Sequence, residues 1–395
     1  MKQYMKNYKM LIFFTVLSLQ NLAANFVHPV TPTLIQALHL PDYMFGLMFA
    51  CMSGTNFLVS PFWGKLADYF DSKVLISIGC IGYGVGQFLF WQSHDPWIIL
   101  FARCFSGFFV AGVGVCSLTY LVNQSTKEEK GAMLTYYATV QTVTASFGYL
   151  IGGLLGEISV GAAFGSQVVC LMLAGVGFYF LLCKDQKERS AFSGREVLKD
   201  ANPFSAFLQG KKFMTISFAI LFGAVLFSVL ASTAYDQCFN YYVKDQFGFT
   251  SAYNGIIKAA IGFISLIANM TLCMYIIKKT DVAKSAAKIL LVGTLLMIAV
   301  VSTRNLSIFV VLTVIYLAVN SISVPVLQSL VTDRAEQKTS NLVMGFYNAI
   351  KNLGGVLGAL LAGFIYEIGP KLPFFFGAFC FGISFIFAAA YIKKK

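Results

Sequence analysis

Charged residues are scarce in this chain. Only 12% of its 395 residues are Asp, Glu, Lys or Arg, and 57% are apolar, whereas soluble proteins carry about 25% charged residues. This shortage excludes the two or three soluble domains that the length alone would allow. Apolar runs of about 20 residues recur from end to end, and each is long enough to cross about 30 Å of hydrocarbon as a helix. The sequence therefore predicts an all-α membrane protein with many spans.

Motifs for metal, redox and nucleotide chemistry are missing as well. The nine cysteines show no CxxC or similar spacing, and most lie inside apolar runs, where we interpret them as small buried hydrophobic residues. No phosphate-binding glycine loop occurs, which argues against ATP hydrolysis as the energy source. We therefore expect no enzyme activity, no cofactor and no metal. We also expect no cleavable signal peptide, because the first apolar run is too long and contains Asn21, Asn25 and His28.

Twelve apolar runs predict twelve transmembrane helices. They cover residues 10–37, 43–63, 74–92, 96–122, 132–156, 163–183, 213–240, 252–277, 286–303, 306–331, 342–366 and 372–391.

The basic residues collect on one side of these predicted helices. With the N-terminus in the cytoplasm, the opposite side holds only Lys244, Arg304 and Lys371. Such a bias is the positive-inside rule. It predicts that both termini are cytoplasmic, and it explains the net charge of +12 without a nucleic-acid partner.

The longest polar stretch, residues 184–212, divides the chain into two predicted six-helix bundles, 1–183 and 213–395. The two halves also share residues at a nearly constant offset. The pairs are Tyr137 and Tyr347, Gly148 and Gly358, Gly153 and Gly363, and Glu157 and Glu367, each 210 apart, and Gly46 and Gly255, 209 apart. A parallel repeat of this kind is typical of transporters that bind their substrate between two halves.

The stretch GKLADYFDSK lies between the second and third predicted helices. One interpretation is a solvated turn of a helical hairpin. The stretch also keeps the spacing G-x-L-A-D-x-x-x-x-K, which is carried by Gly64, Leu66, Ala67, Asp68 and Lys73. This spacing resembles the signature loop of the major facilitator superfamily.

The resemblance implies that the loop latches the two halves on the cytoplasmic side. Asp68 would then face the N-terminus of a helix that begins near Asn341, where the helix dipole favours a carboxylate. Asp71 and Ser72 stand where the family usually has glycine and arginine, which implies a latch of different strength.

Two further motifs resemble those of this superfamily. Arg103 and Gly107 have the R-x-x-x-G spacing of its fourth-helix motif. Gly148, Gly152 and Gly153 match the antiporter motif G-x-x-x-G-P-x-x-G-G of the fifth helix, with Tyr149 in place of the proline; plain packing by small residues is the alternative interpretation. The segment HPVTPTLI also resembles the first helix of the multidrug:proton antiporters of Gram-positive type.

Four ionisable residues lie deep inside predicted helices, where a charge is costly unless it faces water or a partner. The resemblance places Asp236 at an acid that takes part in proton coupling; the alternative is a solvated acid paired with Lys244. Arg103 cannot lose its proton, so we interpret it as a fixed charge that biases a nearby acid; the alternative is a structural ion pair. Lys258 and Lys351 add positive charge, which favours an anionic or zwitterionic substrate.

The two lysines leave alternatives open. Lys258 would extend toward the lipid headgroups, and Lys351 would pair with Asp236 or Glu157. Neutral side chains are also expected to line a substrate cavity. They are Asn21, Asn25, Tyr137, Gln141, Asn320 and Tyr347.

The sequence favours a bacterial plasma-membrane transporter, a monomer whose partners are protons, a small molecule and the lipid bilayer. We expect proton-coupled export of hydrophobic or amphipathic compounds by alternating access. Two alternatives stay open: a facilitator or flippase for an anionic or zwitterionic metabolite or lipid, and a membrane sensor built on a transporter fold.

Overall fold

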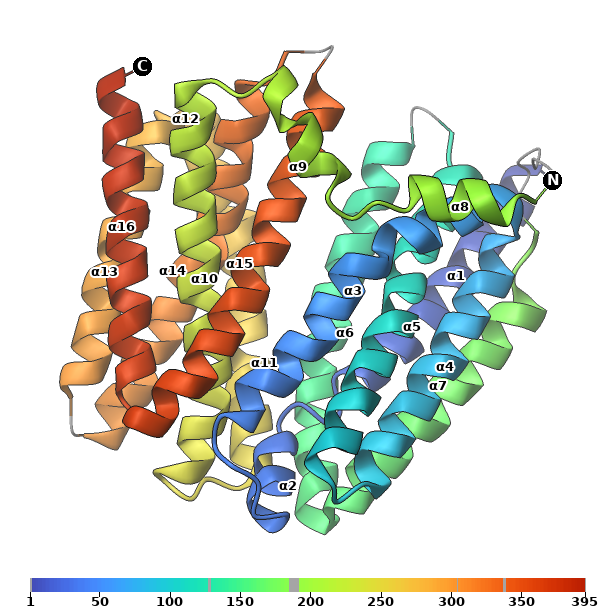
Figure 1. The fold of residues 1–395 in the computed structure, drawn as a ribbon, viewed down its shortest axis with the longest axis horizontal. Coiled ribbons are helices and arrows are strands. Elements are labelled where there is room, and N and C mark those ends of the chain that lie inside the picture. The colour runs from blue at the N-terminus through green and yellow to red at the C-terminus, as the bar shows by residue number, and fades with distance from the viewer. Residues whose placement is uncertain (1, 127–128, 185–191, 304, 337–338, 395) are drawn as a thin grey trace. The chain divides into compact units, whose positions relative to one another are not determined.

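The computed structural model describes residues 2–126, 129–184, 192–303, 305–336 and 339–394, and within these ranges it contains helices and no strand (Figure 1). The helices are α1 (Lys2–Ala24), α2 (Thr31–Ala37), α3 (Met44–Tyr69), α4 (Ser72–Gln92), α5 (Pro96–Gln124), α6 (Lys130–Ile158), α7 (Val160–Leu181), α8 (Gly194–Asp200), α9 (Ser205–Gln209), the 3₁₀ helix η1 (Gly210–Lys212), α10 (Ile216–Asp245), α11 (Ser251–Ala268), the π-helix η2 (Asn269–Cys273), α12 (Met274–Lys279), α13 (Val282–Ser302), α14 (Leu306–Asp333), α15 (Ser340–Ile368) and α16 (Leu372–Lys394).

Eleven helical stretches of the described chain are long and apolar enough to cross a membrane, and Tyr8–Ala24 is a shorter apolar helix. Together they give the twelve helices that the sequence predicts. The all-α membrane class is therefore confirmed.

The first predicted span, 10–37, is not one helix. α1 ends at Ala24, the chain turns, and α2 begins at Thr31. Pro29 has no backbone N–H to continue the helix, and Pro32 lies in the first turn of α2, where proline is favoured. The segment HPVTPTLI therefore forms this turn and α2 rather than the middle of a helix.

The polar stretch 64–73 is mostly helical, which corrects the loop expected there. α3 continues to Tyr69, and α4 begins after only two residues. The Asp71 side chain accepts a hydrogen bond from the backbone N–H of Lys73 and so caps α4. A helix can extend past the hydrocarbon when its last turns are polar, and here the Lys65 ammonium lies 3.6 Å from the Asp68 carboxylate.

The chain forms two compact units. Unit 1 contains residues 1–38, 51–203 and 249–259, and unit 2 contains residues 39–50, 204–248 and 260–395. Consequently α3 begins in unit 2 and continues in unit 1, whereas α11 begins in unit 1 and continues in unit 2. The sequence-based division into 1–183, a linker and 213–395 stays a prediction.

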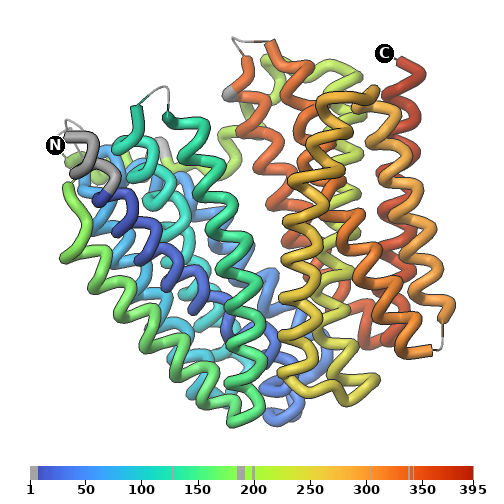
Figure 2. The backbone as a smooth tube through the Cα atoms, turned by 180° about the vertical axis from the view of Figure 1, so that it is seen from behind, coloured from blue at the N-terminus to red at the C-terminus, as the bar shows by residue number. Residues whose placement is uncertain are grey.

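In unit 1, α4 packs against α5 and α7, and α1 packs against α6 and α7 (Figures 1 and 2). Aromatic side chains fill the space between α1, α5 and α7. Phe13, Tyr120 and Phe178 are completely buried, and the Phe13 and Tyr120 rings stack with centroids 5.1 Å apart. The buried Trp63 indole of α3 donates a hydrogen bond to the Phe108 carbonyl of α5 at 2.8 Å.

In unit 2, α10 packs against α15 and α16, and α13 packs against α14 and α16 (Figure 2). The Tyr235 ring lies 4.4 Å from the Tyr316 ring and 5.0 Å from the Phe374 ring. All three side chains are fully buried. The Tyr235 and Thr313 hydroxyls share a hydrogen bond of 2.8 Å, so the polar end of this aromatic core has a partner.

Each unit contains one close helix contact between repeat-related glycines. In unit 1, a Cβ atom added at Gly153 of α6 would lie 3.0 Å from the Gly255 Cα atom of α11. In unit 2, a Cβ atom added at Gly46 of α3 would lie 2.9 Å from the Gly363 backbone nitrogen of α15. Only glycine lets the backbones come this close. The offsets of 210 and 209 seen in the sequence therefore correspond to one repeated contact.

A glutamate accompanies each glycine contact. Glu157 Oε1 accepts a hydrogen bond from the Ala252 N–H at the start of α11 at 2.8 Å. Glu367 Oε1 accepts one from the Tyr43 N–H just before α3 at 3.3 Å. The first N–H groups of a helix have no partner inside the helix, and the helix dipole favours a negative charge there. These glutamates cap the helix starts, which gives the repeat-related acids a structural role.

We expect Gly46→Ala and Gly255→Ala each to lower the thermal unfolding temperature of the detergent-solubilised protein. The added methyl group would meet backbone atoms of the neighbouring helix, and overpacking of this kind costs about 1–3 kcal/mol. Gly114→Ala is the matched control, because a Cβ atom there meets nothing within 4 Å. Unfolding of all three variants at the wild-type temperature would show that the close contacts do not stabilise the fold.

Candidate functional site

The repeat-related helices α6 and α15 each carry an exposed polar stripe inside an apolar span. On α6 the exposed residues are Thr135, Thr139 and Thr142; on α15 they are Asn348, Lys351 and Asn352. Polar and charged groups are rarely directed into lipid within a transmembrane helix and more often face a water-filled space. The two stripes are therefore the candidate transport surfaces, one in each unit.

The polar residues predicted in unit 1 lie together, where α1 meets α6. Asn21 Nδ2 donates hydrogen bonds of 2.7 Å to the Gln141 carbonyl and to Thr144 Oγ1. Asn25 Nδ2 donates to the Asn21 carbonyl at 2.7 Å. Tyr137 is buried on α6, one turn before Gln141. These contacts hold α1 against α6 beside the threonine stripe, and a direct role in substrate binding stays a prediction.

Two glycines of the predicted helix-5 motif, Gly148 and Gly152, pack against the end of α1. A Cβ atom at Gly148 would lie 2.9 Å from Asn25 Cβ, and one at Gly152 would lie 2.5 Å from Phe26 Cα. Tyr149, which replaces the motif proline, has its ring centroid 5.5 Å from that of His28. The motif thus fixes the point where the chain leaves α1 for α2.

Arg103 lies in the core of unit 1, with 6% of its surface exposed. Its guanidinium lies over the Phe90 ring, 5.1 Å from the centroid. A cation over an aromatic face is stabilised when water is excluded. The Arg103 side chain is therefore fixed in position by its packing. Its part in proton coupling stays a prediction.

Asp236, the predicted coupling acid, lies on α10 in unit 2. It is partly buried and directly follows the fully buried Tyr235. Asn320 accepts a hydrogen bond from Ser323 Oγ at its carbonyl (2.7 Å), and the buried Tyr347 hydroxyl donates to the Val324 carbonyl at 3.4 Å. The latter bond joins α15 to α14 in the same unit.

The two lysines differ in exposure. Lys258 of α11 has only 7% of its surface exposed, so its side chain is buried in protein and does not extend toward lipid headgroups. Lys351 is exposed on the polar stripe of α15. Of the two cations, Lys351 is the one that a substrate on that stripe could reach.

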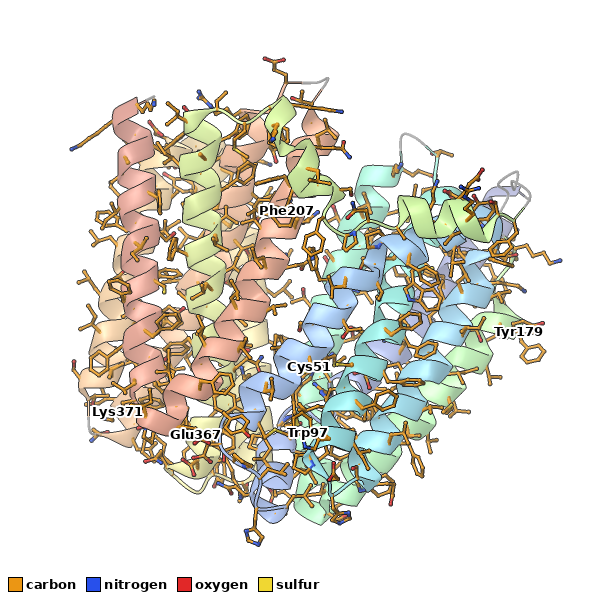
Figure 3. The ribbon with its side chains drawn as sticks, viewed as in Figure 1. Cys51, Trp97, Tyr179, Phe207, Glu367 and Lys371 are labelled. Atoms are coloured by element: carbon orange, nitrogen blue, oxygen red, sulfur yellow. The ribbon has the colours of Figure 1, made fainter. Side chains whose placement is uncertain are left out.

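The residues of the predicted latch also have local roles. Lys73 Nζ donates hydrogen bonds to the Tyr179 carbonyl (3.0 Å) and the Leu182 carbonyl (3.2 Å) at the end of α7, where Figure 3 marks Tyr179. A cation at a helix C-terminus is favourable. A Cβ atom at Gly64 would meet only Val115, at an ordinary 3.7 Å, so packing does not require glycine there. The latch between halves that the motif implies stays a prediction.

Unit 2 also contains a carboxylate–tyrosine cluster that the sequence did not indicate. The Tyr241 hydroxyl donates to Asp42 Oδ1 at 2.5 Å, and the Tyr366 hydroxyl donates to Asp245 Oδ2 at 2.6 Å. The two tyrosine rings pack edge to face with centroids 5.3 Å apart. Asp42 and Asp245 lie at the ends of apolar runs, so in the sequence they are indistinguishable from ordinary solvated acids.

A cavity of about 860 Å³ lies among helix ends of unit 2, far along α10 from Asp236. It contains none of the predicted site residues. Its lining residues are Thr215, Phe218, Thr280, Asp281, Val282, Ala283, Leu330, Asp333, Arg334, Glu336 and Tyr391.

The sequence matches a family of known membrane proteins. The Major Facilitator Superfamily model matches residues 12–303 and 282–395. The chain belongs to this family. Multidrug resistance protein 1 of Bacillus subtilis (strain 168) is 22% identical over 386 residues, with 98% of this chain and 97% of that protein covered. Quinolone resistance protein NorA of Staphylococcus aureus is 24% identical over 358 residues, with 90% and 89% covered.

Solved structures agree on the facilitator fold. A bacterial homologue of the human lysosomal transporter Spinster, in an inward-facing and occupied conformation, has a TM-score of 0.78 at 13% identity, with 98% of this chain and 96% of that chain covered. The nucleoside transporter NupG has a TM-score of 0.75 at 16% identity, with 98% of each chain covered. At such identities the likeness shows the fold alone. The predicted facilitator fold, with twelve helices in two six-helix bundles, is therefore confirmed.

We expect Tyr241→Phe and Asp42→Asn each to lower the unfolding temperature of the purified facilitator. A hydrogen bond to a charged acceptor contributes about 1.5–3 kcal/mol, and either substitution weakens or removes it. The double variant Tyr241→Phe/Asp42→Asn should unfold at no lower a temperature than the less stable of the two single variants. Tyr253→Phe is the control, since this tyrosine is 59% exposed. Fully additive losses in the double variant would mean that the hydroxyl and the carboxylate do not act as a pair.

Proposed function

We propose that this facilitator exports hydrophobic or amphipathic small molecules from a bacterial cytoplasm in exchange for protons. The observation that carries the proposal is the pair of exposed polar stripes on α6 and α15. They lie on repeat-related helices within apolar spans, and Thr142 and Asn352 are 210 residues apart, as expected for a transporter built from two repeats. The names of the two full-length relatives, a multidrug resistance protein and a quinolone resistance protein, support export of drug-like compounds.

The positive-inside rule supports a location in the plasma membrane with both termini in the cytoplasm. In that orientation the starts of α3 and α11 face the outside. Alternating access requires helix contacts that form in one state and break in the other. We propose that the contacts Gly46–Gly363 and Gly153–Gly255, with their glutamate caps, close the outer side and separate when the transporter opens outward. The Asp68 motif would serve as the latch of the inner side.

Proton coupling is proposed to depend on Asp236. This partly buried acid lies within the apolar α10, beside the fully buried Tyr235. A carboxylate that exchanges its proton inside a transport path could be loaded on one side of the membrane and unloaded on the other. Arg103 would act at a distance, as a fixed positive charge in the core of unit 1.

A second candidate function is transport of an anionic or zwitterionic metabolite or lipid. It is favoured by one observation: Lys351 is exposed on the polar stripe of α15. At the repeat-related position of α6 stands the neutral Gln141, so the stripe of unit 2 is the one with a formal charge.

We expect Asp236→Asn to abolish substrate accumulation driven by an imposed pH gradient in proteoliposomes, down to the level of empty vesicles. Exchange of substrate without a gradient should persist, because the binding surfaces are unchanged. Asp245→Asn is the matched control, since it removes a carboxylate from the same helix. That carboxylate accepts a hydrogen bond from the Tyr366 hydroxyl. Gradient-driven accumulation by Asp236→Asn at wild-type rates would exclude the coupling role.

We expect Lys351→Gln to lower the affinity for anionic or zwitterionic amphiphiles and to leave or raise the affinity for lipophilic cations. Opposite charges 4 Å apart gain about 4 kcal/mol at an effective dielectric of 20. Even a quarter of that is about a fivefold change in affinity. Asn352→Ala is the control, because it shortens a neutral side chain on the same stripe and leaves the charge unchanged. Equal affinities of wild type and Lys351→Gln for both classes would remove the support for the second candidate function.

A further inference from the structure

Three exposed threonines of α6 lie along one line of the helix. Thr135, Thr139 and Thr142 are four and three residues apart, the spacing of neighbours on one helix face. Thr135 precedes Gly153 by 18 residues, which is five full turns of 3.6 residues. Gly153 packs against Gly255 of α11 within unit 1. The threonine stripe therefore continues a face of α6 that is turned toward protein and not toward lipid.

Each hydroxyl group of the threonine stripe donates its proton to its own helix. The Oγ1 atoms of Thr135, Thr139 and Thr142 lie 3.0, 2.9 and 3.0 Å from the carbonyl oxygens of Gly131, Thr135 and Ala138. A carbonyl oxygen has no proton, so the hydroxyl is the donor in all three bonds. A hydroxyl has one proton and two lone pairs. What it offers to the exposed side is therefore a hydrogen-bond acceptor.

The three acceptors select a kind of ligand by its hydrogen-bonding groups. A hydroxyl could donate to a ligand only by giving up the bond to its own helix, which in a helical threonine also fixes the side-chain rotamer. An ammonium group with N–H protons can donate to such oxygens. A quaternary ammonium ion has no proton to donate, and an anion would meet only lone pairs. The threonine stripe is therefore complementary to a cation that carries N–H groups.

Exposed aromatic side chains flank the threonine stripe on one side. Tyr136 and Phe147 are 59% and 43% exposed, and their separation of 11 residues is about three turns, so they lie on the same side of α6. An aromatic ring offers apolar surface to the body of a ligand, and its face also attracts a cation. The acceptor oxygens and the rings together suit an amphipathic cation.

We propose that the threonine stripe selects amphipathic cations with N–H groups over quaternary ammonium ions and over anions. This inference rests on the proposed function, in which the stripe lines the substrate path, and it adds a substrate class to that function. A primary ammonium group donates to the threonine Oγ1 atoms, and the apolar body of the same ligand lies against Tyr136 and Phe147.

The test compares two fluorescent cations that differ only in their N–H groups, anthracenylmethylammonium and its trimethylammonium analogue. Fluorescence anisotropy gives the Kd of each for the detergent-purified protein at neutral pH, where both carry one positive charge. The variant Thr135→Val/Thr139→Val/Thr142→Val should raise the Kd of the primary ammonium about tenfold, as expected for the loss of one hydrogen bond to a charged group. It should leave the Kd of the trimethyl ion unchanged.

Thr15→Val is the matched control. Thr15 of α1 is also exposed and donates to its own helix, at 2.8 Å from the Leu11 carbonyl. It lies between Leu11 and Leu19, which are 64% and 36% exposed, so its surroundings are apolar. Both Kd values should stay at the wild-type level. The variant with serine at all three positions of the threonine stripe keeps the hydroxyl groups and should keep the wild-type Kd of the primary ammonium.

Three results would overturn the proposal: equal losses of affinity for both cations in the valine variant, an unchanged Kd of the primary ammonium, or no binding of the primary ammonium by the wild-type protein. If the triple valine variant does not fold, the single variant Thr139→Val provides the same comparison. Binding in detergent needs no pH gradient. Loss of proton-driven export with the binding preference intact would therefore refute the proposed function and leave the acceptor surface in place.

Discussion

The close backbone contact between glycines is the constraint on which the two units depend. In a membrane, helices gain little from burying apolar side chains against each other, since lipid is equally apolar, so close packing and hydrogen bonds determine how they associate. Gly153 against Gly255 and Gly46 against Gly363 supply the packing. Glu157 and Glu367 accept the hydrogen bonds, from backbone N–H groups at the starts of the helices that these contacts bring close to them. A larger side chain at any of the four positions would move a helix.

The candidate transport surfaces are the faces of α6 and α15 that do not pack against other helices. α6 and α15 use their glycines for helix contacts and leave a polar stripe exposed on another face, with threonines on α6 and with Asn348, Lys351 and Asn352 on α15. One helix of each repeat thus combines a packing face with a transport face. A shift of the glycine contact would therefore also move the polar stripe, which is the coupling that alternating access needs.

The sequence predicted the class, the twelve helices and the paired residues of the repeat, because apolar runs and constant offsets are visible in one dimension. It did not predict which residues touch. Pro29 and Pro32 could have indicated the break between α1 and α2, because proline favours the start of a helix and disrupts its middle. The hydrogen bond between Tyr241 and Asp42 was not, since these residues lie 199 positions apart. Nor could the sequence distinguish the buried Lys258 from the exposed Lys351, because both lie within apolar runs.

In the proposed mechanism, the contact between α3 and α15 opens during transport. Tyr43 and Phe364 stack across it with ring centroids 5.3 Å apart. The direct measurement is substrate transport by Tyr43→Cys/Phe364→Cys, in a background with the native cysteines replaced by serine, before and after oxidation to a disulfide. We expect oxidation to stop transport in proteoliposomes and reduction to restore it. Transport by the fully cross-linked protein at the rate of the reduced protein would show that this contact does not open.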